Sequence, residues 1–332
     1  MKRRDFLKSM AAMVGWFAVG CMPAKESAQE APKEADRRGY YHILLVSDLH
    51  LPVRSKKFPG QAEQADVWQK KQRLLKTVNA WGDVDEAALL GDLAARYGNE
   101  SEYQAADAYL GSLKFPYYAV AGNHDYAYKD EPRISSKGKE KTVPAAPEEK
   151  KAKLAAFQKR YKQPGLYYAR SVGDCRLLYL APDGCGTYVE LSPEQLDWLK
   201  SEIAAHKTGP VFFFCHAPLL GTLRTYGKKI NTPDFTAQPS EVLEEILADV
   251  PPGSLWISGH THTPPTNDSY ADDSVNRVHR NLVNIHNPTI DVCHIYTNSL
   301  FLYKDRAVVR TYDHNEGKWL ESLDRTFSFV GA

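Results

Sequence analysis

Residues 44–50 read LLVSDLH and residues 255–262 read LWISGHTH. In both stretches an apolar run typical of a β-strand ends, and side chains that can bind a metal follow at once. Three more stretches share this design: ALLGDLA at 88–94, YAVAGNHD at 118–125 and VFFFCHAP at 211–218. Because residues just past the carboxyl ends of strands converge on one crevice of an open α/β sheet, we expect the polar side chains at the five ends to lie close together. These side chains are Asp48, Asp92, Asn123, His216 and His260.

Two of these motifs carry a second metal-capable histidine. One residue separates Asp48 from His50, and one separates His260 from His262, so each pair lies on the same side of an extended backbone. Imidazole and carboxylate ligands without a thiolate suit Mn, Fe or Zn. Two carboxylates brought together without a cation would raise each other's pKa, so a bound metal is expected beside Asp48 and Asp92.

The ordered set DxH, GD, GNHD, H and GHTH resembles the calcineurin-like metallophosphoesterase family over residues 48–262. The resemblance implies an α/β fold, a four-layer α/β/β/α sandwich, with two divalent transition metal ions at the strand ends. Two metals ~3.5 to 4 Å apart can hold a hydroxide and clamp both oxygens of an in-line displacement at phosphorus. The resemblance assigns Asp48, His50 and His262 to the first metal, Asn123, His216 and His260 to the second, and Asp92 to a bridging position.

Six further residues are candidates for direct or supporting roles in the reaction. His124 resembles the family's non-ligand histidine, a general acid or a donor to a phosphoryl oxygen, and Asp125 could fix its orientation through the other ring nitrogen. A role for His124 in supporting a ligand is the alternative. Candidate substrate contacts, with ordinary surface or packing roles as the alternative, are Arg96, Tyr126, Arg224 and His286.

From Tyr40 to the end of the chain, residues 40–332, short apolar runs alternate with helical patterns, which indicates one catalytic domain with a sheet flanked by helices. Ser192 as a cap, Pro193 at the first position and Gln195 in a capping box predict a helix. Residues 129–153, rich in Lys, Glu and Pro, predict an inserted loop, either a solvated excursion or a lid. Closing strands are expected after Asn281. The other predicted strands are 43–47, 87–90, 117–121, 177–180, 211–215 and 255–258.

The first residues are expected to direct export. Residues 1–20 join a cationic start to an apolar run that is shorter than the ~20 residues needed to span a bilayer, as in a signal peptide. Arg3 and Arg4 resemble a twin-arginine signal. Cys21 is a candidate lipidation site, and residues 21–39 have the composition of a tether. We therefore expect a periplasmic protein or a membrane-anchored lipoprotein that faces the periplasm.

Composition limits the partners. The chain has 332 residues, 43% of them hydrophobic, and a formal net charge of +1, which lacks the basic excess of a nucleic-acid binder. Its five cysteines form no CxxC pair, although Cys175 and Cys185 could pair after export. We expect the substrate to be a small-molecule or lipid phosphate ester, either a monoester or a diester. The alternatives are a nuclease of the same family and a non-catalytic lipoprotein that binds metal or phosphate.

Overall fold

The computed structural model describes residues 38–227 and 229–330. The predicted export signal and Cys21 therefore lie outside the described residues, as does nearly all of the predicted tether. The first sheet contains β1 (Tyr41–Val46), β2 (Glu86–Leu89), β3 (Tyr117–Ala119), β12 (Tyr296–Leu302), β13 (Arg306–Asp313), β14 (Lys318–Trp319) and β15 (Arg325–Ser328). The second sheet contains β6 (Tyr167–Val172), β7 (Cys175–Leu180), β8 (Val211–Cys215), β9 (Ser254–Ser258), β10 (Arg277–His279) and β11 (Leu282–His286).

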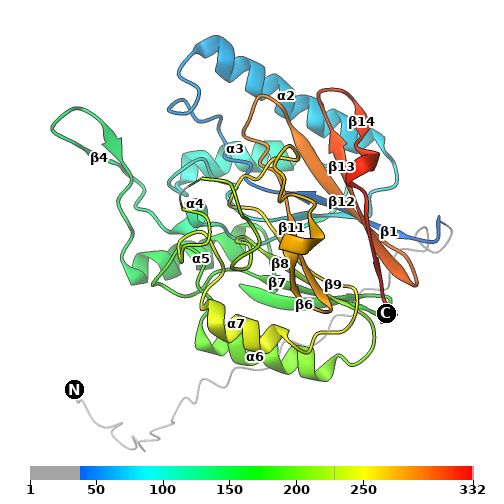
Figure 1. Ribbon diagram of the computed structural model, residues 1–332. Helices are drawn as coiled ribbons and strands as arrows, with labels where there is room; N and C mark the ends of the chain where they lie inside the picture. The colour runs from blue at the N-terminus through cyan, green and yellow to red at the C-terminus, as the bar shows by residue number, and fades with distance from the viewer. Residues whose placement is uncertain (1–37, 228, 331–332) are drawn as a thin grey trace, which may run out of the picture.

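Strand direction brings the predicted motifs to one edge of the molecule. The first sheet has the order β14-β13-β12-β1-β2-β3, with β15 beside β13, and β1, β2 and β3 are parallel. The second sheet has the order β10-β11-β9-β8-β7-β6, and β7, β8, β9 and β11 are parallel. The carboxyl ends of both parallel groups meet at the same edge, where loops from the two sheets face each other (Figure 1).

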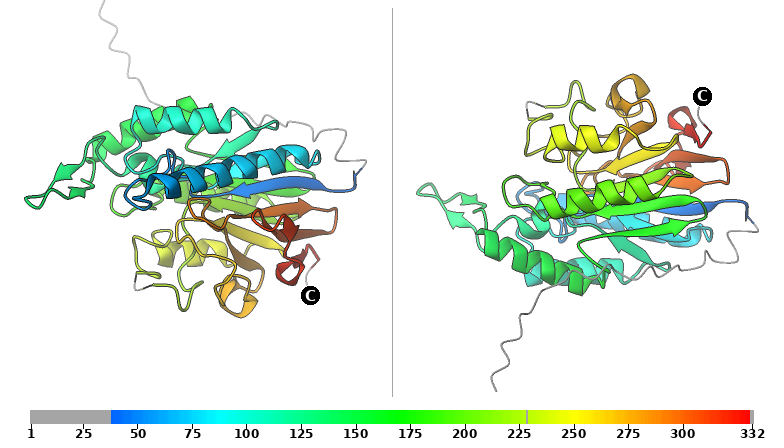
Figure 2. Two further views of the ribbon diagram at one scale, coloured as in Figure 1. Left: turned by 90° about the horizontal axis from the view of Figure 1, so that it is seen from above. Right: turned by 90° about the horizontal axis from the view of Figure 1, so that it is seen from below.

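Helices cover the two outer faces of the sheet pair. α2 (Gln61–Ala80) and α3 (Glu100–Leu110) pack on the first sheet, and α6 (Pro193–Ala205) and α7 (Ser240–Leu247) pack on the second (Figure 2). The expected four-layer α/β/β/α sandwich is confirmed. The described residues also form the helices α4 (Asn123–Tyr126), α5 (Pro147–Arg160) and α8 (Asp273–Asn276) and the 3₁₀ helix η1 (Glu321–Leu323).

The apolar runs of the second sheet are continuous because both of its faces are buried. Phe212 and Phe214 of β8 point into the core between the sheets, whereas Phe213 joins the layer under α6 and α7. This alternation follows from the two-residue period of a strand, and a parallel strand covered on both faces needs an apolar residue at every position. Phe213 stacks on Trp256 of β9 with ring centroids 5.6 Å apart.

The six predicted strands are present, with ends shifted by at most two residues, and strands follow Asn281 as expected. Ser192 caps α6 by accepting a hydrogen bond from the Gln195 backbone, but Gln195 does not complete a capping box. Its amide donates to the Asp183 carboxylate, which also accepts from the Ser192 backbone N–H at 2.7 Å. Asp183, in the loop after β7, therefore takes the place that the sequence assigned to Gln195.

The predicted inserted loop at 129–153 is only partly irregular. It contains a hairpin of β4 (Arg133–Ile134) and β5 (Glu140–Lys141), which projects from the body in Figure 1. Its last residues begin α5, whose Leu154 and Phe157 are buried in the core, so the helix is anchored by packing beyond the predicted boundary.

Cys175 and Cys185 are both free, so the pairing considered from the sequence is not formed. Within the described residues, none of the helices has the length and apolar character required to cross a membrane.

Candidate metal centre

All seven predicted ligands follow the carboxyl ends of parallel strands. Asp48 and His50 follow β1, Asp92 follows β2 and Asn123 follows β3 in the first sheet. His216 follows β8, and His260 and His262 follow β9 in the second sheet. The centre therefore lies between the two sheets and is built from both halves of the sandwich.

The backbone at the ligands is unusual. Five of the seven non-glycine residues with positive φ in the described chain are predicted ligands. Residues other than glycine rarely adopt this conformation, and such conformations cluster at functional sites, where the surrounding structure holds them in place. The five are Asp48 (φ 54°), His50 (43°), Asp92 (53°), His260 (64°) and His262 (55°).

The glycines before the ligands permit close approach of the loops. A Cβ on Gly259 would lie 1.6 Å from Ser47 Oγ, and a Cβ on Gly122 would lie 2.4 Å from the Asp92 backbone nitrogen. Any side chain at either position would force apart the loops that carry Asp48 and Asp92.

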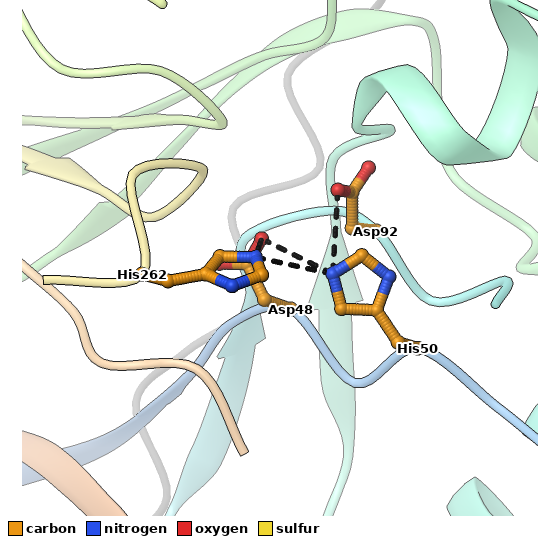
Figure 3. Close-up of side chains that lie close together, drawn as sticks. All are labelled: Asp48, His50, Asp92 and His262. Atoms are coloured by element: carbon orange, nitrogen blue, oxygen red, sulfur yellow. Dashed lines mark hydrogen bonds and ion pairs between the residues drawn. The ribbon is translucent and has the colours of Figure 1, made fainter. Parts of the chain in front are cut away.

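Four ligands form the first cluster, which Figure 3 shows. Their donor atoms lie within 4.8 Å of one another: Asp48, His50, Asp92 and His262. The Nε2 atoms of His50 and His262 are 3.1 Å apart, and His262 Nε2 lies 3.0 Å from Asp48 Oδ1. His50 Nε2 is 3.7 Å from Asp92 Oδ2. Two imidazole nitrogens and two carboxylates that converge in this way form a nitrogen and oxygen donor set for a divalent transition metal.

Asp92 also belongs to a second cluster with His216 and His260. His216 Nε2 lies 3.4 Å from Asp92 Oδ1 and 3.2 Å from Asn123 Oδ1. The two oxygens of the Asp92 carboxylate thus face different clusters, which is the arrangement expected of a bridging ligand.

Backbone carbonyls orient three of the ligand imidazoles. His216 Nδ1 lies 2.7 Å from the Leu90 carbonyl, His50 Nδ1 lies 3.2 Å from that of Ala95, and His260 Nε2 lies 2.8 Å from that of Asp234. Because a carbonyl only accepts, the proton of each neutral ring resides on the nitrogen beside it. The other nitrogen is then available to a metal.

The electrostatics of the clusters also suit a cation. Burial opposes the charged forms of Asp92 and His216, but each stabilises the other's charge, so the pKa of Asp92 is well below its usual value and that of His216 is raised to about 9. Burial, with the nearby His216, lowers the pKa of His260 to about 4. Without a metal, a proton on His216 is therefore what partly compensates the buried carboxylates.

His124 lies beside the centre but is held by different contacts from those predicted. Its Nδ1 is 3.0 Å from the Arg96 carbonyl, and its backbone N–H donates to Asp92 Oδ1 at 2.8 Å. Burial lowers the pKa of His124, although the Asp92 charge acts in the opposite direction. Among the described residues, the other ring nitrogen of His124 has no hydrogen-bond partner.

Asp125 does not orient His124, so that prediction is corrected. Its carboxylate accepts backbone N–H bonds from Leu93 (3.0 Å), Ala94 (2.9 Å) and Gly122 (2.8 Å). The side chain of the third residue of α4 turns back to the helix start, as in a capping box, and cannot also reach the neighbouring ring. Asp125 therefore ties the loop after β2 to the loop after β3 and so positions the ligands.

The four candidate substrate contacts lie in different surroundings. Arg96 pairs with Glu140 of the β4–β5 hairpin at 3.3 Å, and Arg224 is exposed. Tyr126 is fully buried and donates to the Tyr188 carbonyl at 2.8 Å, and buried His286 lies 2.9 Å from the Thr222 carbonyl. The structure thus contradicts direct substrate contact for Tyr126 and His286, because packing and hydrogen bonding occupy both side chains.

A cavity of about 380 Å³, called the metal cavity below, gives access to the centre. Aromatic side chains form much of its wall, and they were not predicted as site residues because they belong to none of the five motifs. It is lined by Asp92, Asn123, His124, Tyr128, Tyr188, Tyr226, Phe235, His260, Thr261 and His262.

A buried network of charged side chains contacts the backbone of the first cluster, and it was not predicted from the sequence. Lys71 of α2, which is fully buried, donates to the carbonyls of Leu49 and His50 and lies 3.2 Å from the Asp291 carboxylate. Arg54 pairs with the same carboxylate at 2.6 Å. The network holds the backbone of the DxH motif, and no sequence pattern connects its distant members.

Comparisons with known proteins bear on the family and the fold. The model of the calcineurin-like phosphoesterase family matches residues 41–264, which include all seven ligands. The structure of purple acid phosphatase PPD1 from yellow lupin (Lupinus luteus) seeds aligns with a TM-score of 0.51 and 13% identity over 87% of this chain and 54% of that chain. The chain thus spans about half the length of the lupin protein, and the likeness shows the fold. Vps29 from Chaetomium thermophilum gives a TM-score of 0.33 and 11% identity over 87% of this chain and 98% of that chain. No curated protein sequence matches the chain.

Proposed function

The chain belongs to the calcineurin-like phosphoesterase family, and we propose that it hydrolyses a phosphate ester with two divalent metal ions held by the clusters on either side of Asp92. The observation that carries this proposal is the shared Asp92 carboxylate, whose two oxygens lie 3.7 Å from His50 Nε2 and 3.4 Å from His216 Nε2. Metal-dependent release of alcohol from generic phosphomonoesters and phosphodiesters, absent after chelation, tests it.

The residues fit Mn, Fe or Zn, because the donors are imidazole, carboxylate and amide groups without a thiolate. When bound, the two ions would activate a water molecule and stabilise negative charge on the phosphoryl group. Asp48, His50 and His262 would hold the first ion, with Asp92 between the two. Asn123, His216 and His260 would hold the second.

The chain itself supplies the remaining groups. His124, anchored through Nδ1, presents its other ring nitrogen to the leaving group or to a phosphoryl oxygen. An anionic phosphate beside the ring would favour its protonated form and so offset the effect of burial. Asp125 holds the loop of Asp92 and the loop of Asn123 in place relative to each other by accepting backbone hydrogen bonds from both.

Metal binding is expected to depend on pH through His216. Its metal-free pKa is about 9, and a metal needs the neutral ring, so below pH 9 the ion must displace one proton. His260, with a pKa of about 4, is already neutral at neutral pH and adds no such dependence. Apparent affinity should therefore rise about tenfold per pH unit between pH 6 and 8 from this proton alone. Calorimetry in buffers of different ionisation enthalpy measures the proton release. A metal affinity that does not change between pH 6 and 8 would contradict the assignment.

We further propose that hydrolysis occurs outside the cytoplasm, with the protein anchored by lipid on Cys21, on the basis of the predicted export signal. Acyl chains contribute ~0.8 kcal/mol per buried CH₂, so two or more chains would hold the protein on a membrane. Cys21→Ala should move the protein from the membrane fraction to the soluble fraction or leave an unprocessed precursor. Unchanged fractionation together with unchanged mature mass would overturn the lipoprotein proposal.

Two other functions are less well supported. A nuclease of the same family would bind a polyanion, but the formal net charge is only +1. A non-catalytic binding protein would not need His124 beside a complete set of seven ligands. Activity on small phosphate esters compared with activity on DNA and RNA separates these functions.

A further inference from the structure

A second cavity of about 380 Å³, called the side cavity below, adjoins the metal cavity. Two residues line both cavities, Tyr226 and His262. Tyr226 donates from its hydroxyl to the backbone carbonyl of His262 at 2.9 Å, so this bond joins the Tyr226 side chain to the His262 backbone where the two cavities meet. A group bound at the first cluster therefore has free space on both sides of His262.

The side cavity lies directly against the first cluster. His262 Nε2 is 3.0 Å from Asp48 Oδ1, and the His262 side chain is 25% exposed, whereas those of Asp48 and His50 are fully buried. Thr289, on the wall of the side cavity, donates to the Asp48 carbonyl at 3.0 Å. The wall and the ligand loop are thus hydrogen-bonded to each other.

The lining of the side cavity suits an uncharged ring. Pro264, Pro288 and Val292 supply apolar surface, and the ring of Tyr296 is stacked on His294 with centroids 4.7 Å apart. No lysine, arginine, aspartate or glutamate is among the lining residues. Small-molecule sites are concave and predominantly apolar, with volumes of about 300 to 1,000 Å³, and aromatic walls favour ring groups.

One difference between the two cavities concerns the proton donor for the leaving group. His124 lines the metal cavity but not the side cavity. A departing alkoxide needs a proton, so the alcohol that leaves belongs in the metal cavity, beside His124. The side cavity has no comparable donor assigned to the reaction.

We propose that the side cavity binds the alcohol that stays attached to phosphorus, so that the substrate is a phosphodiester with an uncharged, ring-containing group on that side. In the reaction, water adds its oxygen to phosphorus and the P–O bond to the alcohol in the metal cavity breaks. That alcohol leaves with a proton, and the other stays on phosphorus as a phosphomonoester. This inference rests on the proposed function, since it assumes that phosphorus binds at the metal clusters.

Thr266→Trp provides the test, because Thr266 is exposed and lines only the side cavity, where the added indole would occupy space that a bound ring needs. Val242→Trp is the matched control, since Val242 is 39% exposed on α7 and lines neither cavity. With metal-loaded protein, Thr266→Trp should lower kcat/KM for bis(4-nitrophenyl) phosphate about 10- to 100-fold, the expected loss for one ring that can no longer be buried. Hydrolysis of 4-nitrophenyl phosphate should change less than about twofold, and the control should change neither rate.

A binding measurement gives a second readout that does not depend on turnover. Diphenylphosphinate carries two rings on phosphorus and cannot be hydrolysed, whereas inorganic phosphate fills neither cavity. Calorimetry should show weaker binding of diphenylphosphinate to Thr266→Trp by a similar factor and unchanged binding of phosphate.

Three results would overturn the side-cavity assignment and leave the proposed function standing. Thr266→Trp could lower kcat/KM equally for both esters or lower it for neither, or the native protein could cleave the monoester but not the diester. If the native protein cleaves neither ester with any divalent metal, the proposed function fails. In that case the binding comparison still decides whether the side cavity accepts a ring.

Discussion

Asp92→Asn is expected to release metal from both clusters and to reduce phosphoesterase activity by at least about 10³-fold. The asparagine is nearly isosteric, but it is neutral and offers only one oxygen, so it cannot serve both sides as the carboxylate does. Removing even one group that stabilises charge at a reacting centre lowers the rate about 10²- to 10³-fold, and here the binding of two ions depends on one residue. Elemental analysis and kcat/KM on a generic ester measure the two effects together.

Asp268→Asn is the matched control, because it makes the same chemical change at an exposed residue that belongs to neither cluster. Its metal content and activity should equal those of the native protein. If Asp92→Asn keeps both its metals and near-native activity, Asp92 is not a bridge. Loss of one metal only would assign the carboxylate to a single ion.

His124→Ala is expected to slow hydrolysis of an alkyl phosphate ester about 10²- to 10⁴-fold, the usual contribution of general acid catalysis. An activated ester such as 4-nitrophenyl phosphate should lose far less, because its phenolate leaves without needing a proton. Metal content should not change, since His124 is not among the donors of either cluster, and its ring meets that of His50 only by an edge contact with centroids 5.1 Å apart. The measurement is kcat/KM for both ester types with metal analysis of the same samples.

His206→Ala serves as the control, because His206 follows α6 and is absent from both clusters and from the metal cavity. An equal loss on both esters with metal retained would show that His124 stabilises charge on the phosphoryl oxygens and does not protonate the leaving group. Loss of metal would show that it supports a ligand.

The clustering of the candidate ligands and the fold were predictable because both follow from a local rule. Each motif places its polar residue at the point where an apolar run ends, and parallel strands bring such points to one edge. Asp48 and His216, far apart in the chain, therefore lie in one centre. Glycines accompany some of these points, and Gly122 and Gly259 occupy positions where a Cβ would collide with a neighbouring loop.

The direction of a side chain was not predictable from its position in a motif. Asp125 and Tyr126 both follow His124, yet the Asp125 carboxylate turns to backbone N–H groups and the Tyr126 hydroxyl to a remote carbonyl. These side-chain orientations depend on the short helix α4 and on the loop that contains Tyr188, neither of which has a sequence signature. Lys71 and Asp291 were missed for the same reason, because a charge pair across 220 residues leaves no periodic pattern.

The central claim, two metal ions on either side of Asp92, is tested most directly by anomalous X-ray diffraction from crystals of the native protein grown with Mn²⁺ or Zn²⁺. We expect two anomalous peaks ~3.5 to 4 Å apart, with one Asp92 oxygen bound to each. His50 and His262 should bind one ion, and His216 and His260 the other. A single peak, or two peaks that do not share the Asp92 carboxylate, would contradict the account.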